Sequence, residues 1–234
     1  IRLVTIRGMY TPTHYQMPDA AIQELLRSPN SGDLITQTEN GISATYTPFL
    51  YDPDMSELGS LIGHLAWLND DWKHTGRECL VILHGPEAYL HSDWLREPDE
   101  EQVVAITNFV TVHCYGELIV HTDPDWALDA VRRLSSMFEP AYELLEVPER
   151  LLEGMMKAMV AVEVRIKRIE GHARMSQKNS PERLRKIIAG LRSIGDTSVS
   201  QWMEDYSLPY AIEKDKLVQA AAARRKPRNP AEHE

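Results

Sequence analysis

The chain has 234 residues, 43% of them hydrophobic, which is enough to build a buried core, and a formal net charge of −10. Because affinity for nucleic acid depends largely on Lys and Arg neutralising phosphates, this acidic balance opposes a broad surface for nucleic acid, and we expect any binding to duplex DNA to be weak at physiological salt. No run approaches the roughly 18 apolar residues of a membrane span, and residues 1–9 lack a signal-peptide pattern, so we expect a cytoplasmic protein without a membrane partner.

The first half of the chain predicts a small antiparallel barrel. A helix is expected over residues 18–26, where Pro18 and Asp19 stand at its start. Asn40-Gly41 suits the positive φ of a hairpin turn and Gly85-Pro86 is expected to end a strand. Strands are expected at residues 33–38, 42–50, 59–68, 79–84, 88–91 and 103–121. Their spacing is typical of a strongly curved antiparallel barrel.

The second half predicts helices that flank one more strand. Helices are expected over residues 124–137, 148–159 and 181–191. Residues 160–169 alternate apolar with charged side chains, which indicates a half-buried strand, and a polar loop is expected over 171–179. We therefore predict one domain over residues 1–195, followed over 196–234 by a helical extension and a disordered tail.

Cys79 and Cys114 are the two cysteines, and both have apolar neighbours in the sequence. Two buried thiols in a cytosolic protein is the simpler interpretation. A disulfide between them is the alternative.

The stretch that most clearly suggests a functional site is the apolar one at residues 60–72, where His64 follows Gly63. A neutral imidazole in an apolar wall can serve as the axial ligand of an iron porphyrin. The same pattern is also that of an ordinary buried histidine. His64 is thus a candidate ligand with a structural alternative.

Four groups of residues, in this order along the chain, resemble motifs of the PaiB-like family of FMN-binding split barrels. They are Met9-Tyr10-Thr11-Pro12; Gly63-His64-Leu65-Ala66; His84-Gly85-Pro86 with Ser92-x-Trp94; and Arg168-Ile169-Glu170-Gly171 with Met175-Ser176-Gln177. The resemblance implies an α+β, mainly β, fold: a split β-barrel of the flavin-reductase/PNPOx-like type with flanking helices. It also implies a homodimer with its cofactor at the subunit interface.

The chain departs from this family in the strand associated with the flavin. The family pattern Pro-Thr-Trp-Asn-Tyr is Ala105–Phe109 here, and only Asn108, and His113 further along, match it. Loss of the tryptophan and the proline indicates a changed ligand. One branch similar to this family binds haem b, and its members resemble piperazate synthases, which close the N–N bond of L-piperazate from N5-hydroxy-L-ornithine with loss of water.

This resemblance implies a haem-dependent cyclase that acts on a small-molecule substrate, with His64 as the iron ligand and haem b as the cofactor. The alternative is an FMN-binding negative transcriptional regulator of the PaiB type. His113 is expected to be a structural histidine of the barrel and is the next candidate ligand.

The remaining candidates are polar residues near the expected cofactor. Thr107, Asn108 and Arg174 are the candidates for catalytic or substrate contacts. Contacts to the cofactor are assigned to Ser92, Trp94, Ser176, Gln177 and Lys178. For Thr107 and Asn108 the alternative is a cross-strand hydrogen bond. For Ser92 and Trp94 it is a surface turn anchored by the tryptophan, and for residues 174–178 it is a solvated loop.

Overall fold

The computed structural model describes residues 11–96, 103–140 and 147–225. Its contacts divide the chain into two compact units. Of the described residues, the barrel unit comprises 11, 16–85, 111–140 and 147–172, and the helical unit comprises 12–15, 86–96, 103–110 and 173–225. The domain boundary expected at residue 195 stays a prediction. Of the helical extension and disordered tail expected over residues 196–234, residues 226–234 lie outside the described residues.

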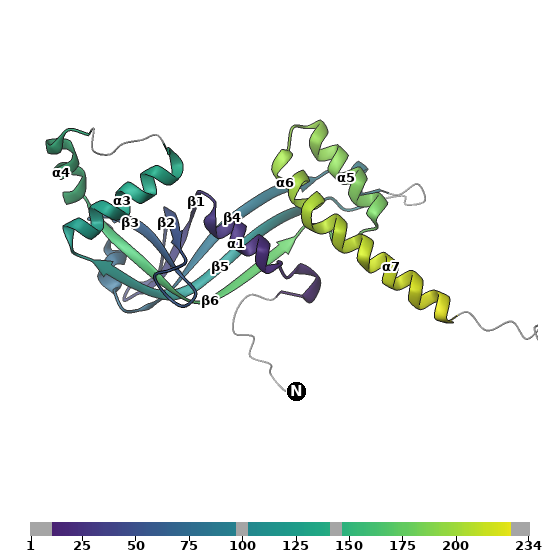
Figure 1. The fold of residues 1–234 in the computed structure, drawn as a ribbon, viewed down its shortest axis with the longest axis horizontal. Coiled ribbons are helices and arrows are strands. Elements are labelled where there is room, and N and C mark those ends of the chain that lie inside the picture. Colours follow the sequence, from purple (N-terminus) through teal and green to yellow (C-terminus); the bar gives the residue numbers. More distant parts are fainter. Residues whose placement is uncertain (1–10, 97–102, 141–146, 226–234) are drawn as a thin grey trace, which may run out of the picture. The chain divides into compact units, whose positions relative to one another are not determined.

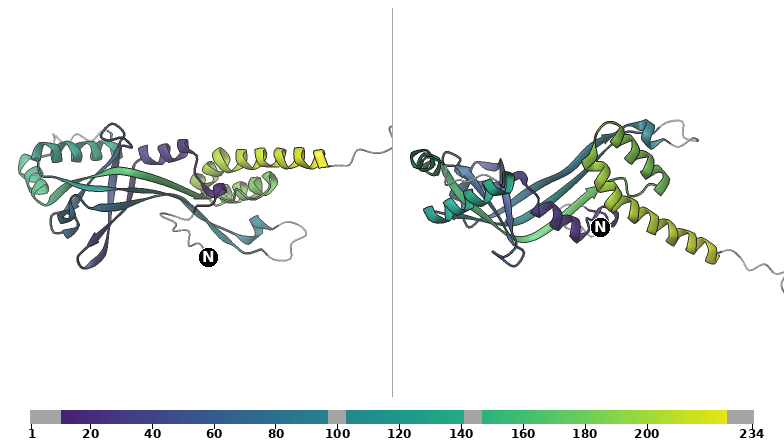
Figure 2. Two further views of the ribbon diagram at one scale, coloured as in Figure 1. Left: turned by 90° about the horizontal axis from the view of Figure 1, so that it is seen from below. Right: turned by 45° about the horizontal axis from the view of Figure 1, so that its top comes forward.

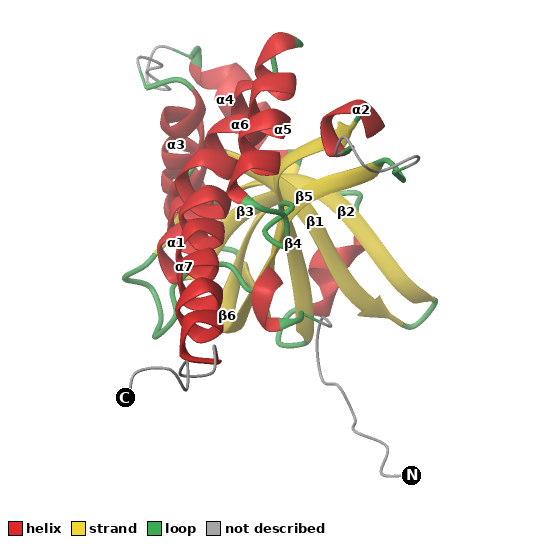
Figure 3. Cartoon of the chain, turned by 90° about the vertical axis from the view of Figure 1, so that its right-hand side faces the viewer, coloured by secondary structure: helices red, strands yellow, loops and turns green. Residues whose placement is uncertain are grey.

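Six strands close into a barrel in the order β1-β2-β3-β6-β5-β4, which confirms the predicted fold (Figure 3). The pairs β1–β2, β1–β4, β2–β3 and β3–β6 are antiparallel. The strands are β1 (Asn30–Thr38), β2 (Gly41–Asp52), β3 (Ser60–Ala66), β4 (Glu78–Leu90), β5 (Ile106–His121) and β6 (Met159–Arg174).

The β1–β2 hairpin forms where Asn40-Gly41 predicts it. Gly41 has φ +115°, a conformation that a side chain would strain. The Thr38 hydroxyl donates to the Gly41 carbonyl at 2.9 Å and accepts from the Asn40 N–H at 3.1 Å, which closes the turn. Local chemistry therefore sets the register of the two strands, from Thr38 opposite Gly41 to Asn30 opposite Phe49.

The strands bury a continuous apolar core. Several of their side chains are completely excluded from solvent: Leu34, Val81, Val112, Cys114, Leu118, Val162 and Val164. Cys79 and Cys114 are both buried and free, as the simpler interpretation of the sequence expected. Burial raises the pKa of each thiol to about 12, so neither is a reactive thiolate at neutral pH.

Helices α3 (Pro124–Phe138) and α4 (Glu149–Lys157) belong to the barrel unit and lie at the same end as β3 (Figure 1). The side chain of Asp123 caps α3 by accepting from the N–H of Asp125. Ala130 of α3 packs on Ile62 of β3 and Ala161 of β6. One face of the β3–β6 pair is thus covered by a helix. The barrel unit also holds α1 (Asp19–Arg27) and the 3₁₀ turn η2 (Asp70–His74).

The helical unit is built around α5 (Pro181–Ser193), which packs beside α7 (Leu208–Arg225) (Figure 2). Its core is apolar and includes Leu184, Ile187, Leu191, Val199 and Met203. Its shorter elements are η1 (Thr13–Tyr15), α2 (Ser92–Leu95), α6 (Thr197–Trp202) and the π-helical turn η4 (Met203–Ser207). Within the described residues, no helix is long and apolar enough to cross a membrane.

Two expectations about strand ends were wrong. The expected strands at residues 79–84 and 88–91 are one strand, β4, which continues through Gly85-Pro86. Pairing of β4 with β1 ends at Leu83, so the missing N–H of Pro86 removes no bond to β1.

The strand expected to end at residue 169 is also longer than predicted. β6 continues to Arg174, so the polar loop expected from residue 171 begins at Met175. His172 forms a bridge with Gln16, and the Gly171 carbonyl accepts from the N–H of Met17 at 3.3 Å. A partner segment 154 to 156 positions away in the sequence therefore extends this strand, and the local pattern could not predict it.

Candidate functional site

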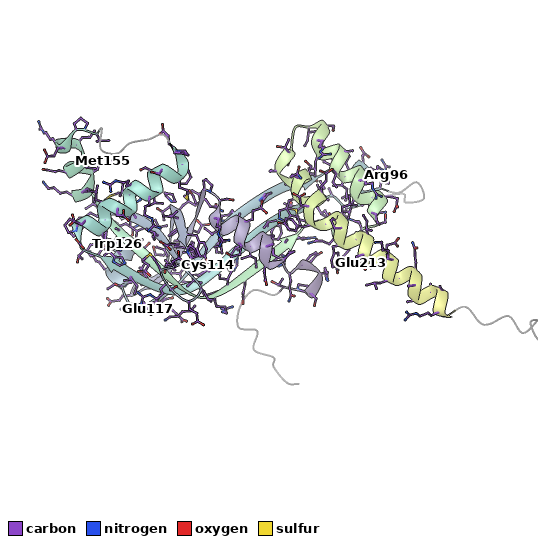
Figure 4. All side chains as sticks on the ribbon, viewed as in Figure 1. Arg96, Cys114, Glu117, Trp126, Met155 and Glu213 are labelled. Atoms are coloured by element: carbon purple, nitrogen blue, oxygen red, sulfur yellow. The ribbon has the colours of Figure 1, made fainter. Side chains whose placement is uncertain are left out.

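The barrel unit contains a cavity of about 760 Å³, which we call the barrel cavity. Its lining is mainly apolar and comes from the residue after β3, η2, the end of β5, α3, α4 and the start of β6. Trp67 and Trp72 form part of its wall, with ring centroids 4.8 Å apart and the indole N–H of Trp72 donating to the Trp67 carbonyl. Trp126 of α3, labelled in Figure 4, belongs to the helix that contributes Ala127 and Leu128 to the lining. A cavity of this size and character suits a small organic ligand.

His64 lies on the sheet face that borders this cavity. Its partner in register on β6 is Ala161, which lines the barrel cavity, and directly paired residues share a face of the sheet. The Nδ1 atom of His64 is buried without a hydrogen-bond partner among the described residues. Burial lowers the pKa of His64 below its ordinary value, so the ring is neutral at physiological pH. A neutral imidazole is the form that binds a metal.

Gly63, which precedes His64, has a packing role in the barrel. A Cβ at this position would lie 3.0 Å from the Phe49 ring and 3.1 Å from the Pro48 carbonyl oxygen. The glycine beside His64 is therefore explained by strand packing, without any cofactor. The hydroxyl of Thr47 donates to the His64 carbonyl at 2.9 Å and holds the strand at this point.

A second histidine, His121, lines the barrel cavity directly. Its Nε2 lies 2.9 Å from Oε2 of Glu163, whose side chain is only 2% exposed. The Ser60 hydroxyl donates to the other carboxylate oxygen at 2.8 Å, and Arg165 Nε lies 3.4 Å from that oxygen. The His121 ring also stacks on Trp126, with centroids 3.6 Å apart and planes inclined by 9°.

This arrangement is suited to moving a proton. An ionised Glu163 can only accept hydrogen bonds, so it holds the proton of His121 on Nε2 and leaves Nδ1 as an acceptor. A carboxylate that orients an imidazole is a common arrangement for general acid–base catalysis. Sequence analysis missed this pair, because Glu163 belongs to a strand whose charged residues are expected to face solvent. No local signal links residues 42 positions apart.

Three of the predicted polar residues come together in the helical unit. Asn108 is completely buried, and its Oδ1 accepts from the Ser176 hydroxyl at 3.1 Å. Gln177 bonds to the chain on either side of Ser176: its amide donates to the Ala173 carbonyl, and its oxygen accepts from the Met175 N–H. These groups are satisfied by hydrogen bonds inside the protein, and Ser176 and Gln177 are buried, whereas the alternative expected a solvated loop there.

The other predicted contacts are more exposed. Thr107 lies on the surface near the start of β5, and Ser92 is exposed at the start of α2. Trp94 packs on α5 so closely that a Cβ at Gly190 would lie 2.5 Å from its ring, which matches a turn anchored by one tryptophan. Arg174 is half-buried at the end of β6, and Lys178 is exposed. The cofactor and catalytic roles assigned to all these residues stay predictions.

His113 resembles His64 in one respect. It lies half-buried on β5, and its Nδ1 is buried without a hydrogen-bond partner in the described part of the chain. Burial lowers its pKa, and the nearby His84 and Arg168 lower it further. Neither His113 nor His64 is among the residues that line the barrel cavity, although His64 is paired with Ala161, which does line it.

Known proteins resemble this chain in sequence and in fold. Residues 9–168 match the family described as "Putative FMN-binding domain". An uncharacterized protein of Aspergillus fumigatus is 24% identical, and the match covers 81% of this chain and 91% of that relative. The flavocytochrome Anf3 of Azotobacter vinelandii has a similar fold, with a TM-score of 0.52, 12% identity and 67% of each chain covered.

A second solved structure, titled "putative 5-nitroimidazole antibiotic resistance protein" and from Bacteroides thetaiotaomicron, has a TM-score of 0.51. It is 9% identical, and the match covers 71% of this chain and 89% of that one. At such identities these two structures show likeness of fold alone. The family match spans more than half of the chain, and the barrel has the predicted split-barrel topology. The chain therefore belongs to the PaiB-like family of FMN-binding split-barrel proteins.

Proposed function

We propose that this protein binds haem b through His64 and catalyses formation of an N–N bond, as a relative of the piperazate synthases. The observation that carries the cofactor assignment is the neutral, buried His64 ring, whose Nδ1 has no partner in the described protein, on the sheet face bordering the barrel cavity. A mainly apolar cavity of about 760 Å³ lies within the range of volumes that hold organic ligands and cofactors. The described residues contain no group of three or more His, Cys, Asp or Glu arranged for a bare metal ion, whereas a haem iron needs one protein ligand.

The proposed reaction converts N5-hydroxy-L-ornithine to L-piperazate. The α-amine nitrogen attacks N5, the N5–O bond breaks, and the hydroxyl leaves with a proton as water, so no external oxidant is required. Bound haem supplies a Lewis-acidic iron that makes the hydroxyl a better leaving group.

The chain itself supplies exclusion of water and the transfer of the proton. The tryptophan wall of the barrel cavity keeps the site apolar. His121 accepts the proton of the attacking amine on Nδ1 and returns it to the leaving hydroxyl. Glu163 holds the imidazole ring in place and stabilises its charged form through the 2.9 Å contact.

The second candidate function is an FMN-binding transcriptional regulator, which the family match favours. The net charge of −10 opposes it, because a DNA-binding surface must carry local positive charge. The two functions differ in the cofactor that the purified protein retains.

Absorption spectroscopy of the full chain, incubated with haemin and separately with FMN, tests the cofactor. The haem proposal predicts a Soret band at about 400 nm. His64→Ala is expected to remove or shift this band while the circular dichroism spectrum stays unchanged. His84→Ala is the matched control, since His84 is an exposed histidine paired with Asp33. Uptake of FMN without haem overturns the proposal in favour of the regulator. A folded His64→Ala protein with an unaltered Soret band excludes His64 and makes His113 the next ligand to test.

Turnover of N5-hydroxy-L-ornithine tests the reaction separately. His121→Gln is expected to lower kcat by about 10²–10⁴-fold, as loss of a general acid–base does, while the Soret band is unchanged. It should also remove a limb from the pH profile of kcat. Haem binding by a wild-type protein with no turnover would contradict the cyclase and leave the cofactor assignment standing.

A further inference from the structure

The helical unit contains a separate cavity of about 470 Å³, lined by His14, Gln177, Lys178, Tyr210 and Lys214. These residues come from three segments that are distant in sequence: η1, the loop after β6, and α7. We call this cavity the cationic pocket. It shares no lining residue with the barrel cavity.

Hydrogen bonds to buried residues of the helical unit fix the backbone of the loop that carries Lys178. Ser176 has φ +61°, a left-handed conformation that is uncommon for serine, and its hydroxyl is anchored on buried Asn108. Ser207 donates to the Met175 carbonyl at 2.8 Å, and the Asn179 N–H donates to the Ser176 carbonyl at 3.0 Å. The backbone at Lys178 is therefore positioned before any ligand arrives.

Lys214 of α7 is held against this loop. Its Nζ donates to the Lys178 carbonyl at 3.0 Å, which leaves two N–H donors for a ligand. The ammonium group of Lys178 lies 5.6 Å from the centroid of the Tyr15 ring, a cation–π arrangement. Two ammonium groups thus flank one opening.

His14 adds a donor or acceptor that the protein does not use. Its Nε2 is buried without a hydrogen-bond partner among the described residues, although it belongs to the lining of the pocket. Burial lowers the pKa of His14, and the charges of Lys178 and Lys214 lower it further. The lining contains no carboxylate, and nearby Glu213 of α7 lies 3.6 Å from Lys216.

We propose that the cationic pocket binds a phosphate group, either free or carried by a small molecule. Two lysine ammonium groups match the double charge of a phosphate, and lysine binds phosphate as a point charge. The ring N–H of His14 can donate to a further phosphate oxygen once its proton lies on Nε2. A concentration of unneutralised positive charge is notable in a chain with net charge −10. This proposal does not depend on haem or on the cyclase reaction.

Calorimetric titration of the full chain with inorganic phosphate at neutral pH and physiological salt tests the site. Lys178→Gln and Lys214→Gln are each expected to weaken binding about tenfold or more, as loss of a charged hydrogen bond does. The matched control is Lys216→Gln, which removes a lysine from the same helix that does not line the pocket. Phosphate affinity should be unchanged in that control.

Three results would overturn the proposal: no phosphate binding, an equal loss in Lys216→Gln, or equal affinity for acetate and phosphate. Parallel titrations with FMN and riboflavin identify the source of the phosphate. A preference for FMN that both lysine variants abolish assigns a flavin phosphate to the pocket. Phosphate binding that FMN does not displace assigns free phosphate or another phosphorylated small molecule. Haem uptake, measured separately, is expected to be the same in the wild type, in Lys214→Gln and in Lys216→Gln.

Discussion

His121 on β5 and Glu163 on the neighbouring strand β6 form a contact of 2.9 Å, in which the carboxylate is buried and the imidazole lines the barrel cavity. A buried carboxylate is costly unless its oxygens are satisfied. Ser60 and Arg165 supply the further partners. The protein thus holds this carboxylate in its interior, beside the histidine that lines the barrel cavity.

Glu163→Gln tests how much this group contributes to stability. Loss of the charge weakens the hydrogen bonds to His121 and Ser60, so the free energy of unfolding should fall by about 1.5–3 kcal/mol. Denaturant titration measures the change. Glu117→Gln is the control, because Glu117 pairs with Lys167 at the surface, and its effect should be clearly smaller. Equal effects of the two substitutions would contradict the structural importance of the buried carboxylate.

Gly116→Ala tests the close packing of β5 on β6. A Cβ at this glycine would lie 2.4 Å from the Arg165 carbonyl oxygen and 2.9 Å from the Val164 side chain. The backbone must shift to accept it, so we expect a loss of about 1–3 kcal/mol in thermal or chemical denaturation. Gly154→Ala in α4 is the counterpart: nothing lies within 4 Å, and alanine there should stabilise the protein by about 0.5–1 kcal/mol. A neutral Gly116→Ala would show that the strands separate more easily than the structure implies.

Asn108→Ala separates a structural role from the catalytic role predicted for this residue. The substitution leaves the buried Ser176 hydroxyl without its acceptor, at a cost of about 1–3 kcal/mol in unfolding free energy. Thr107→Ala at the exposed neighbouring position should change stability by less than about 0.5 kcal/mol. If Asn108→Ala retains wild-type stability and loses turnover, the catalytic role is supported and the structural one is rejected.

His64 should make stability depend on pH. Its pKa is lowered in the folded state, while the unfolded chain binds a proton near the ordinary value of about 6.5. The unfolded state therefore binds more protons as pH falls below that value, so stability is complete above it and declines as pH drops toward the lowered pKa. His64→Gln should show a shallower decline in denaturant titrations at a series of pH values. The decline should not vanish, because the pKa values of His14 and His113 are also lowered. Identical pH profiles would contradict the burial of His64.

Local signals in the sequence were enough for much of the fold. The Asn40-Gly41 turn, the Pro18-Asp19 start of α1, and the alternation of apolar residues along the strands act over a few neighbouring positions. Such features are readable because backbone conformation and the side-chain period are local properties. The resemblance of motifs around His64 then led to the split-barrel family that the comparison confirms.

Tertiary structure decided what no local pattern could contain. Pairing of His172 with Gln16 extended β6, and the cover of α3 turned one face of an alternating strand into an interior that holds Glu163. The same cause brings His121 to Glu163, and His14 to Lys214 across 200 positions. The sequence by itself determined the barrel, its family and His64 as a candidate ligand. Only folding decided which polar side chains meet, because burial and proximity arise from contacts between distant segments.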